Sequence, residues 1–294
     1  MSDKKDIKAE LSPPYTIVVR TDAAFRGVCY KIISNEEFLQ IHSREKSQLV
    51  YWSEIVQRMH VCAATSVKRI KKWFDATIAA YNAENHYGFC AGLRGLIEAC
   101  ADSSYTLSKV IDPICAEFAH IEAALNARAK RFILSEAIED ELIHYSHARA
   151  LAPSERGTSP KSHKAQHPRV YMDSVRDPAV RDFYSELCQV SHPSAMSLNP
   201  FLTSTDDYAL ILHPVNVDGA LNDSVLRERK QAIVAAATMA IGPAMCVLKM
   251  INEFDTPMTE SLRTSDDALQ PIVESDLWRE MARKIRVSKE AAER

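Results

Sequence analysis

Apolar residues return every three or four positions over most of this 294-residue chain. That spacing is typical of helices that bury one face. The first long run, from about Ser47 to Asn85, carries Trp52, Ile55, Val56, Met59, Ala63, Val67, Ile70, Phe74 and Ile78. Further helices are predicted over about 86–109, 112–151, 178–191, 224–254 and 276–292. The pattern therefore predicts an all-α fold, a multi-helix bundle.

Two stretches interrupt the helical pattern. Residues 152–169 contain proline and glycine among Ser, Thr, Lys and His, with few side chains to bury. We expect an exposed flexible loop there, inside the domain, because the helical pattern resumes afterwards. Residues 201–217 alternate in the manner of strands, which predicts a small β-hairpin that turns at Asp206-Asp207.

The chain ends differ from the middle. Residues 1–14 are polar and end in two prolines, so we expect a disordered arm. Residues 15–255 are expected to form the helical-bundle domain, beginning with a short extended piece over 15–20. Residues 256–294 are expected to form a linker and a C-terminal amphipathic helix.

Composition supports the same fold class. Apolar residues make up 46% of the chain and charged residues 26%, which is ordinary for a soluble globular protein. Only 7 residues are glycine, while alanine is abundant, and this balance favours helix. The net charge of −3 gives no overall basic field for a nucleic acid or a membrane.

The seven cysteines contain no C-x-x-C pair, and most lie within apolar helical patterns. Cysteine in that setting behaves as a small buried hydrophobe, so we expect free thiols and a reducing compartment. Residues 1–10 are polar and lack the apolar core of a signal peptide. These features predict a cytoplasmic protein.

One apolar run has to be compared with a membrane-spanning helix. Residues 232–248 are apolar apart from Thr238, but they are shorter than the ~20 residues of a membrane span. Gly242-Pro243 interrupts the run and is expected to kink a helix. We therefore expect a buried core helix and no membrane partner.

The segment 87–107 separates into three faces when it is wound as a helix. One face is apolar. A second has only small residues, which allows another backbone to approach closely: Gly88, Gly92, Gly95, Ala99 and Ser103. The third is polar but holds two tyrosines: Tyr87, Arg94, Glu98, Asp102 and Tyr105. We expect this helix to be enclosed at the centre of the bundle.

Arg94 and Glu98 lie one helical turn apart on the polar face. They can be a solvated ion pair, a buried pair that fixes the helix register, or part of an active or ligand site. If the site is active, Arg94 and Glu98 are candidate catalytic residues. The flanking Tyr87 and Tyr105 are then candidate substrate-binding residues.

His192 is the third candidate catalytic residue. It follows the predicted 178–191 helix and precedes Pro193, which pushes it out of the α region. Tyr184, Cys188 and Ser191 share one stripe of that helix, and Tyr184 and Ser191 are further candidates for substrate binding. Such a histidine can act as a general acid or base, bind phosphate, or simply link two helices.

These motifs together resemble a family. The pattern R-x3-E at Arg94–Glu98, followed by Y-x2-L-x3-S-H-P-S at Tyr184–Ser194, is similar to that of a bacterial all-α family known only as a domain of unknown function. The resemblance covers about residues 45–255. It implies a helical bundle with the arginine, glutamate and histidine gathered in its middle, and it implies no established activity.

A remoter similarity is to HEPN-type ribonucleases, which use R-x4–6-H on a helix. The literal match, Arg156 to His163, falls in the predicted loop and is interpreted as chance. Arg94 and His192 could supply the same chemistry from two helices, with the arginine holding a phosphate and the histidine moving the proton of the 2′-hydroxyl.

Two E-x-x-H motifs occur, at Glu117/His120 and Glu141/His144, and such pairs bind di-iron centres when they lie on facing helices. Here the pattern places both on one helix, about 36 Å apart at ~1.5 Å per residue. We therefore predict no metal and no cofactor. A basic cluster over 68–72 could contact phosphate backbones, but it is also typical of a solvated helix face.

Two functions remain open, and whether the chain is an enzyme stays undecided. The first is a helical interaction module, an effector or accessory in bacterial stress or phage defence, with a protein partner or a second copy. The alternative is a HEPN-like ribonuclease or nucleotide-binding enzyme that uses Arg94, Glu98 and His192. A solvent-reachable pocket lined by these three residues favours the enzyme, and a sealed cluster excludes it.

Overall fold

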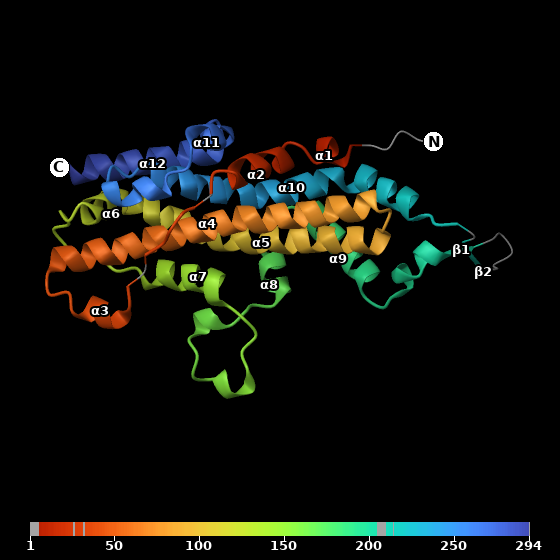
Figure 1. Ribbon diagram of the computed structural model, residues 1–294, viewed down its shortest axis with the longest axis horizontal. Helices are drawn as coiled ribbons and strands as arrows, with labels where there is room; N and C mark the ends of the chain where they lie inside the picture. Colours follow the sequence, from red (N-terminus) through yellow and green to blue (C-terminus); the bar gives the residue numbers. More distant parts are fainter. Residues whose placement is uncertain (1–5, 26, 32, 205–209, 214, 294) are drawn as a thin grey trace. The chain divides into compact units, whose positions relative to one another are not determined.

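The chain folds almost entirely into helices, as a computed structural model shows (Figure 1). The structure describes residues 6–25, 27–31, 33–204, 210–213 and 215–293. The predicted all-α fold with a small β-hairpin is confirmed. The residues form two compact units. Three long helices contribute residues to both units: α4 (Arg44–Asn82), α5 (His86–Ala116) and α10 (Asp218–Asn252).

The first unit comprises residues 1–19, 68–102 and 168–240. Besides parts of the long helices, it contains α1 (Ile7–Glu10), most of α2 (Pro14–Asp22), α8 (Pro168–Asp173) and α9 (Pro178–Ser191). Two 3₁₀ turns follow α9, at Ala195–Ser197 and Asn199–Phe201. The antiparallel hairpin comes next, with β1 (Leu202–Ser204) paired to β2 (Leu210–Leu212) so that Thr203 faces Ile211. The predicted turn at residues 206–207 lies outside the described residues.

Within this unit, α4 and α5 approach closely along the small-residue face predicted for α5 (Figure 1). A Cβ atom on Gly92 would lie 2.7 Å from Thr77 Oγ1 and 3.1 Å from Thr77 Cα. A Cβ atom on Gly95 would lie 2.5 Å from the ring of Trp73. Glycine is needed at both positions because no side chain fits there.

The second unit comprises residues 20–67, 103–167 and 241–294. Its further helices are α3 (Asn35–Leu39), α6 (Phe118–Leu125), α7 (Glu136–His147), α11 (Asp266–Val273) and α12 (Asp276–Ala292), with 3₁₀ turns at Pro153–Glu155, Lys161–His163 and Pro257–Leu262. Phe118 and Phe254 stack at 4.2 Å between ring centroids in its core. The Ala119 amide of α6 donates to Ser288 Oγ of α12 at 3.2 Å. Burial of such apolar surface is the main stabilising contribution.

The structure corrects the prediction for the N-terminal arm. Residues 6–14 were expected to be disordered, yet they include α1, capped by the Asp6 carboxylate, and the start of α2. Residues 15–20, expected to be extended, belong to α2. Ile7 and Leu11 are buried, at 2% and 0% exposure, and Lys230 Nζ lies 2.7 Å from Glu10 Oε2. Tertiary packing of a few apolar residues outweighs the polar composition.

The predicted single helix over 112–151 is also wrong. Helix α5 continues through Pro113 to Ala116, and α6 and α7 follow as separate helices. An internal proline costs about 3 kcal/mol, but the neighbouring Val110, Ile111 and Ile114 are all buried and compensate for it. After α6 the chain turns at Ala127, which has a positive φ of 53°.

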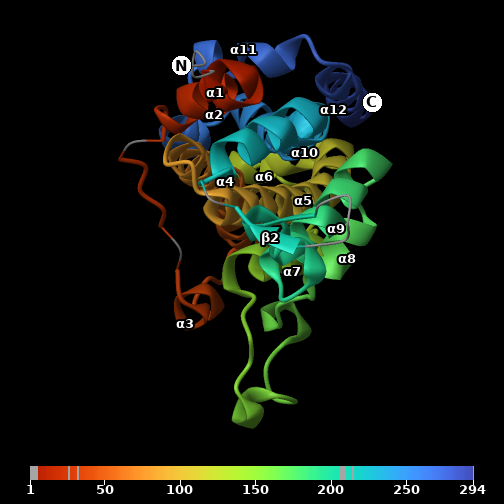
Figure 2. The same ribbon diagram turned by 90° about the vertical axis from the view of Figure 1, so that its right-hand side faces the viewer.

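The other boundaries are closer to prediction. Helix α10 begins at Asp218 rather than Ser224, because the Asn216 side chain accepts from the Asp218 amide at 2.8 Å. Helices α9 and α12 match the predicted 178–191 and 276–292. The predicted loop over 152–169 ends where α8 begins. Its Lys161–His163 turn packs against α7, and the loop extends away from that helix (Figure 2). Helix α11, inside the predicted linker, was not expected.

Among the described residues, α10 is the one helix long and apolar enough to cross a membrane by length and composition. In the structure 67% of its most apolar window is buried. Gly242 and Pro243 lie inside the helix without ending it. This burial agrees with the expectation of a buried helix over residues 232–248.

Candidate functional site

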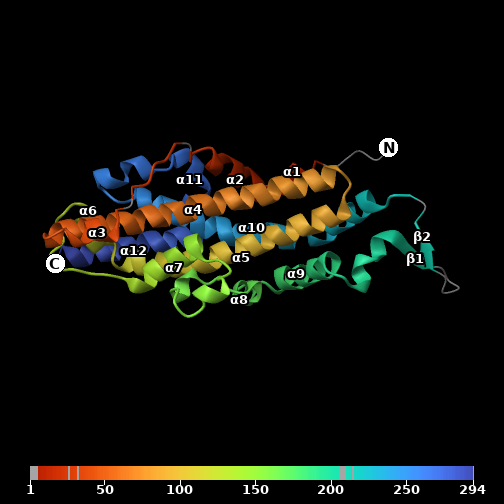
Figure 3. The ribbon, with the colours of Figure 1, turned by 60° about the horizontal axis from the view of Figure 1, so that its bottom comes forward.

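Arg94 of α5 contacts both Glu98 of the same helix and His192, which caps α9. Helix α9 runs alongside α5 (Figure 3). Arg94 Nε donates to Glu98 Oε1 at 3.0 Å, and Arg94 Nη1 lies 3.1 Å from His192 Nε2. The Arg94 and Glu98 side chains are 25% and 32% exposed, and His192 is exposed. The pair is therefore neither fully solvated nor enclosed on every side, which corrects the expected enclosure.

Tyr184 completes this group, which we call the Arg94 network: Arg94, Glu98, Tyr184 and His192. The Tyr184 hydroxyl donates to Glu98 Oε1 at 2.8 Å, and its ring centroid lies 6.0 Å from Arg94 Cζ. Burial raises the pKa of Tyr184 well above its ordinary value, and the bonded Glu98 carboxylate raises it further. Tyr184 is therefore a firm hydrogen-bond donor.

The contact between Arg94 and His192 has one possible direction of hydrogen bonding. Burial alone would lower the pKa of Arg94, but the neighbouring Cys188 and Glu98 raise it above its ordinary value. Because a guanidinium has only donors, His192 Nε2 must be the acceptor in the 3.1 Å contact.

The local sequence explains how α9 presents these groups. The Asp177 side chain accepts from the Ala179 amide and begins the helix beside Pro178. Val180, Phe183 and Leu187 are buried on one stripe, which leaves the neighbouring Tyr184–Cys188–His192 stripe beside α5. The helix ends at Ser191 because His192 adopts extended backbone before Pro193.

Three predicted substrate-binding residues are engaged elsewhere. The Tyr87 hydroxyl donates to the Ser197 carbonyl, and its ring stacks on Phe201. Ser191 Oγ donates back to the Leu187 carbonyl at 2.8 Å, a bond within its own helix. Tyr105 belongs to the second unit, where Lys109 Nζ lies 3.6 Å from its ring centroid. The structure does not bring these three into the Arg94 network.

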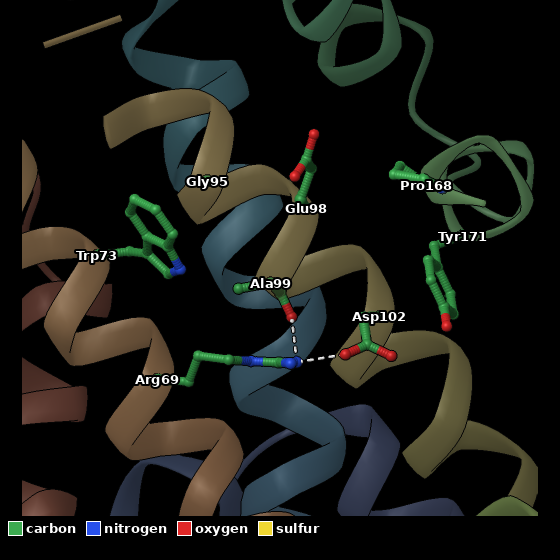
Figure 4. A pocket seen from close by; sticks show the side chains of 8 residues that line it. All are labelled: Arg69, Trp73, Gly95, Glu98, Ala99, Asp102, Pro168 and Tyr171. Atoms are coloured by element: carbon green, nitrogen blue, oxygen red, sulfur yellow. Dashed lines mark hydrogen bonds and ion pairs between the residues drawn. The ribbon is translucent and has the colours of Figure 1, made fainter. Parts of the chain in front are cut away.

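A pocket of about 230 Å³ opens beside Glu98, within the first unit (Figure 4). We call it the Trp73 pocket, and its lining is Arg69, Trp73, Gly95, Glu98, Ala99, Asp102, Pro168 and Tyr171. Of the three candidate catalytic residues, Glu98 lines it, while Arg94 and His192 do not. The structure therefore matches neither of the two arrangements considered from the sequence, a solvent-reachable pocket lined by all three residues or a sealed cluster of them.

Sequence reasoning missed most of this pocket. Asp102 stood on the predicted polar face, but Trp73 and Tyr171 come from α4 and α8, and no local spacing joins them to α5. Cys188, whose charge would act on Arg94, was equally unassigned. Cys188 is four residues from both Tyr184 and His192, so the sequence already placed it on the same face of the helix as they are.

The E-x-x-H motifs lie on different helices, contrary to prediction, yet protein groups engage them. Arg131 pairs with Glu117 at 3.1 Å, and Lys109 pairs with Glu141 at 2.6 Å. His144 Nδ1 contacts the Ser162 carbonyl at 3.0 Å. Among the described residues, no group of three His, Cys, Asp or Glu side chains could hold a metal ion.

Comparison with known proteins does not name the site. No family model, curated protein or solved structure matches the chain. The resemblance to a bacterial family of unknown function therefore stays a prediction. The site must be interpreted from its own chemistry.

Proposed function

We propose that the chain is a helical interaction module, and that the Arg94 network positions α9 against α5 for binding rather than for catalysis. The observation that carries this proposal is the engagement of the guanidinium. Its Nε is bound to Glu98 and its Nη1 contacts His192. An arginine engaged by a carboxylate and an imidazole has less capacity to hold a phosphate.

The energetics agree with a positioning role. A partly exposed ion pair contributes about 0–1 kcal/mol, so the pair alone does not decide stability. The directional bonds from Arg94 and Tyr184 instead fix how the polar stripe of α9 faces α5. A binding surface built on α9 needs that fixed register.

The proposal is tested with the variants Arg94→Ala, His192→Ala and Tyr184→Phe, against exposed control variants Arg181→Ala and His42→Ala. Melting temperature and cleavage of a single-stranded RNA are measured for each. We expect no RNA cleavage by the parent protein, and a lower melting temperature for the three network variants only. RNA cleavage by the parent that is lost in His192→Ala, with the melting temperature unchanged, would overturn the proposal.

A ribonuclease is the second candidate, because one observation favours it. His192 is exposed, with an arginine nitrogen 3.1 Å away, as a general base beside a phosphate ligand would be. Cleavage would need Arg94 to leave Glu98 when a phosphate binds. The same RNA assay decides between the two candidates.

The cellular setting extends the proposal. We place the module in a reducing cytoplasm, as an effector or accessory of bacterial stress or phage defence, with a protein partner or a second copy. All seven cysteines lie within the described residues and none forms a disulfide, which supports a reducing compartment. The family resemblance supports the bacterial setting, and sedimentation of the pure chain tests for a second copy.

A further inference from the structure

The segment after α9 presents large apolar side chains to solvent. Among the described residues, seven of the exposed large apolar side chains lie between positions 196 and 215. We call them the hairpin patch: Met196, Leu198, Phe201, Leu210, Ile211, Leu212 and Val215. Figure 3 shows the hairpin beyond the end of α9. Single exposed apolar residues are normal in proteins, but a group of them along one segment marks an interaction site.

The backbone that carries the first part of this patch is fixed to the bundle. The Tyr87 hydroxyl of α5 donates to the Ser197 carbonyl, and the Tyr87 ring stacks on Phe201. Ser194 Oγ donates to the Gln189 carbonyl of α9 at 2.5 Å. These contacts hold the segment in one arrangement, so its apolar side chains are exposed by the fold itself.

Strand β2 has an open edge and is apolar on both faces. It belongs to a sheet that has two strands within the described ranges, so one of its edges has no strand beside it. Leu210, Ile211 and Leu212 are 69%, 48% and 71% exposed, although successive side chains point to opposite faces. The strand contains neither the lysine nor the proline that blunts many edge strands. Such an edge is a template for another strand.

The register of the hairpin shows which backbone groups face the open edge. The His213 amide donates to the Phe201 carbonyl at 2.9 Å, in line with the β1–β2 register. Hydrogen-bonded pairs alternate along an antiparallel ladder, so Ile211 is the next residue of β2 to bond with β1. Leu210 and Leu212 therefore direct their N–H and C=O groups away from β1, towards the open edge.

We propose that β2 pairs antiparallel with β2 of a second copy of this chain, about a twofold axis at Ile211. In that register Leu210 of one copy faces Leu212 of the other, and each such pair exchanges both of its outward backbone hydrogen bonds. The two Ile211 side chains become cross-strand neighbours at the axis. This inference rests on the proposed role as an interaction module, and it names the partner and the contact surface.

The exposed area is sufficient for a second copy. The seven side chains of the hairpin patch together expose the equivalent of about four whole residues. At about 150 Å² for a large apolar side chain, each copy offers roughly 600 Å². Two copies then reach about 1,200 Å², which is the lower end of the range for specific interfaces. We therefore expect a dimer with a Kd of about 1–10 μM rather than an obligate one.

Charge disfavours two other occupants of the hairpin patch. The sequence has no lysine or arginine between Arg181 and Arg227. Anionic lipid surfaces and nucleic acid both attract basic side chains, and this segment offers none. An uncharged strand of a second copy meets no such mismatch, and the turns of the two hairpins lie at opposite ends of an antiparallel pair.

The first test is sedimentation velocity of the full chain over a range of concentrations. The parent should show a concentration-dependent dimer, and Leu212→Lys should weaken it at least about tenfold, because the charge would lose water at the paired edge. Leu39→Lys is the matched control, since Leu39 of α3 is equally exposed, at 74%, and lies outside the hairpin patch. Melting temperatures show that both variants fold.

Two further variants test the register itself. Leu210→Lys and Leu212→Glu should each dimerise weakly alone and form a tighter heterodimer when mixed, because lysine then faces glutamate on one side of the axis. Ile211→Cys should give a covalent dimer on oxidation with diamide, because paired Cα atoms without mutual hydrogen bonds lie ~4.5 Å apart, within disulfide range. The parent, whose Cys29 is exposed, and Val287→Cys measure the background.

The proposal is overturned if the parent stays monomeric at about 100 μM, well above the expected Kd. A dimer that Leu212→Lys leaves intact would also overturn it, as would a monomer that pellets with phosphatidylcholine vesicles. A monomeric parent that cleaves no RNA would leave the interaction module in place with another partner. RNA cleavage that needs His192 would overturn the module whatever the oligomeric state, so the two failures are distinguishable.

Discussion

At the Arg94 network, one carboxylate oxygen accepts two hydrogen bonds. Glu98 Oε1 receives Arg94 Nε from its own helix and the Tyr184 hydroxyl from α9. The family resemblance implied that Arg94, Glu98 and His192 gather in one place, and Arg94 does contact the other two. The sequence did not distinguish Tyr184, which bonds to Glu98, from Tyr87, which bonds elsewhere, since both were candidates for substrate binding on the same grounds.

Replacing Tyr184 with phenylalanine tests the shared acceptor. Tyr184→Phe keeps the ring over Arg94 and removes the 2.8 Å bond to Glu98. We expect the free energy of unfolding to fall by roughly 1 kcal/mol, measured by urea titration.

Ser185→Ala is the control for this measurement. Its exposed hydroxyl donates to the Arg181 carbonyl of the same helix, so the expected change is under about 0.5 kcal/mol. An equal loss of unfolding free energy in both variants would show that the bond from Tyr184 to Glu98 does not stabilise the fold.

At the scale of the helix, periodicity predicted the elements whose stability comes from one buried stripe. Helix α9 has matching predicted and observed bounds because Asp177-Pro178 and His192-Pro193 are local signals. Helix α1 was missed because its anchors, the buried Ile7 and Leu11 and the ion pair of Glu10 with Lys230, make no periodic apolar pattern. The break between α6 and α7 was missed because apolar spacing continues across it while the backbone turns at Ala127.

The close contact of α4 with α5 predicts that a side chain added at Gly92 destabilises the fold. Gly92→Ala would place a Cβ atom 3.1 Å from the backbone of Thr77, and a helix backbone cannot move aside locally. We expect the free energy of unfolding to fall by about 1–3 kcal/mol, as for other overpacked sites, despite the better helix propensity of alanine.

Gly219→Ala in α10 is the matched substitution. There the new Cβ atom would lie 3.4 Å from the Glu84 side chain, an ordinary contact with a flexible group. Urea titration should show no loss for this variant. A loss at Gly219 as large as at Gly92 would mean that close helix approach is not the cause.

For the whole molecule, composition and periodicity were sufficient for the fold class, because an alanine-rich, glycine-poor chain with 3.6-residue spacing has few other solutions. The division into two compact units was not predictable, since α4, α5 and α10 contribute to both without a break in their pattern. The Trp73 pocket was hidden for a related reason, as its walls come from α4 and α8.

A buried histidine makes the stability of the chain depend on pH. Burial lowers the pKa of His60 from its ordinary 6.5 to about 4, against a smaller opposing effect of the Leu262 backbone. The folded state thus favours neutral His60, whose Nδ1 lies 2.7 Å from the Tyr30 hydroxyl. This stabilisation is complete above pH 6.5 and is lost as the pH falls to about 4.

The expected loss in the free energy of unfolding across that window is roughly 3 kcal/mol, measured by urea titration at several pH values. His60→Gln should flatten this part of the profile, while the exposed His42→Gln should leave it unchanged. An unchanged slope in His60→Gln would show that other groups cause the acid sensitivity.

The burial of five of the seven cysteines has a consequence for the lifetime of the chain. Burial raises the pKa of Cys90, Cys100, Cys115 and Cys246 to about 12, so little reactive thiolate forms while the chain is folded. An unfolded copy exposes the same thiols to oxidants, and a sulfinic or sulfonic acid cannot return to an apolar core. Oxidation therefore acts as an irreversible trap for copies that unfold, and it spares those that stay folded.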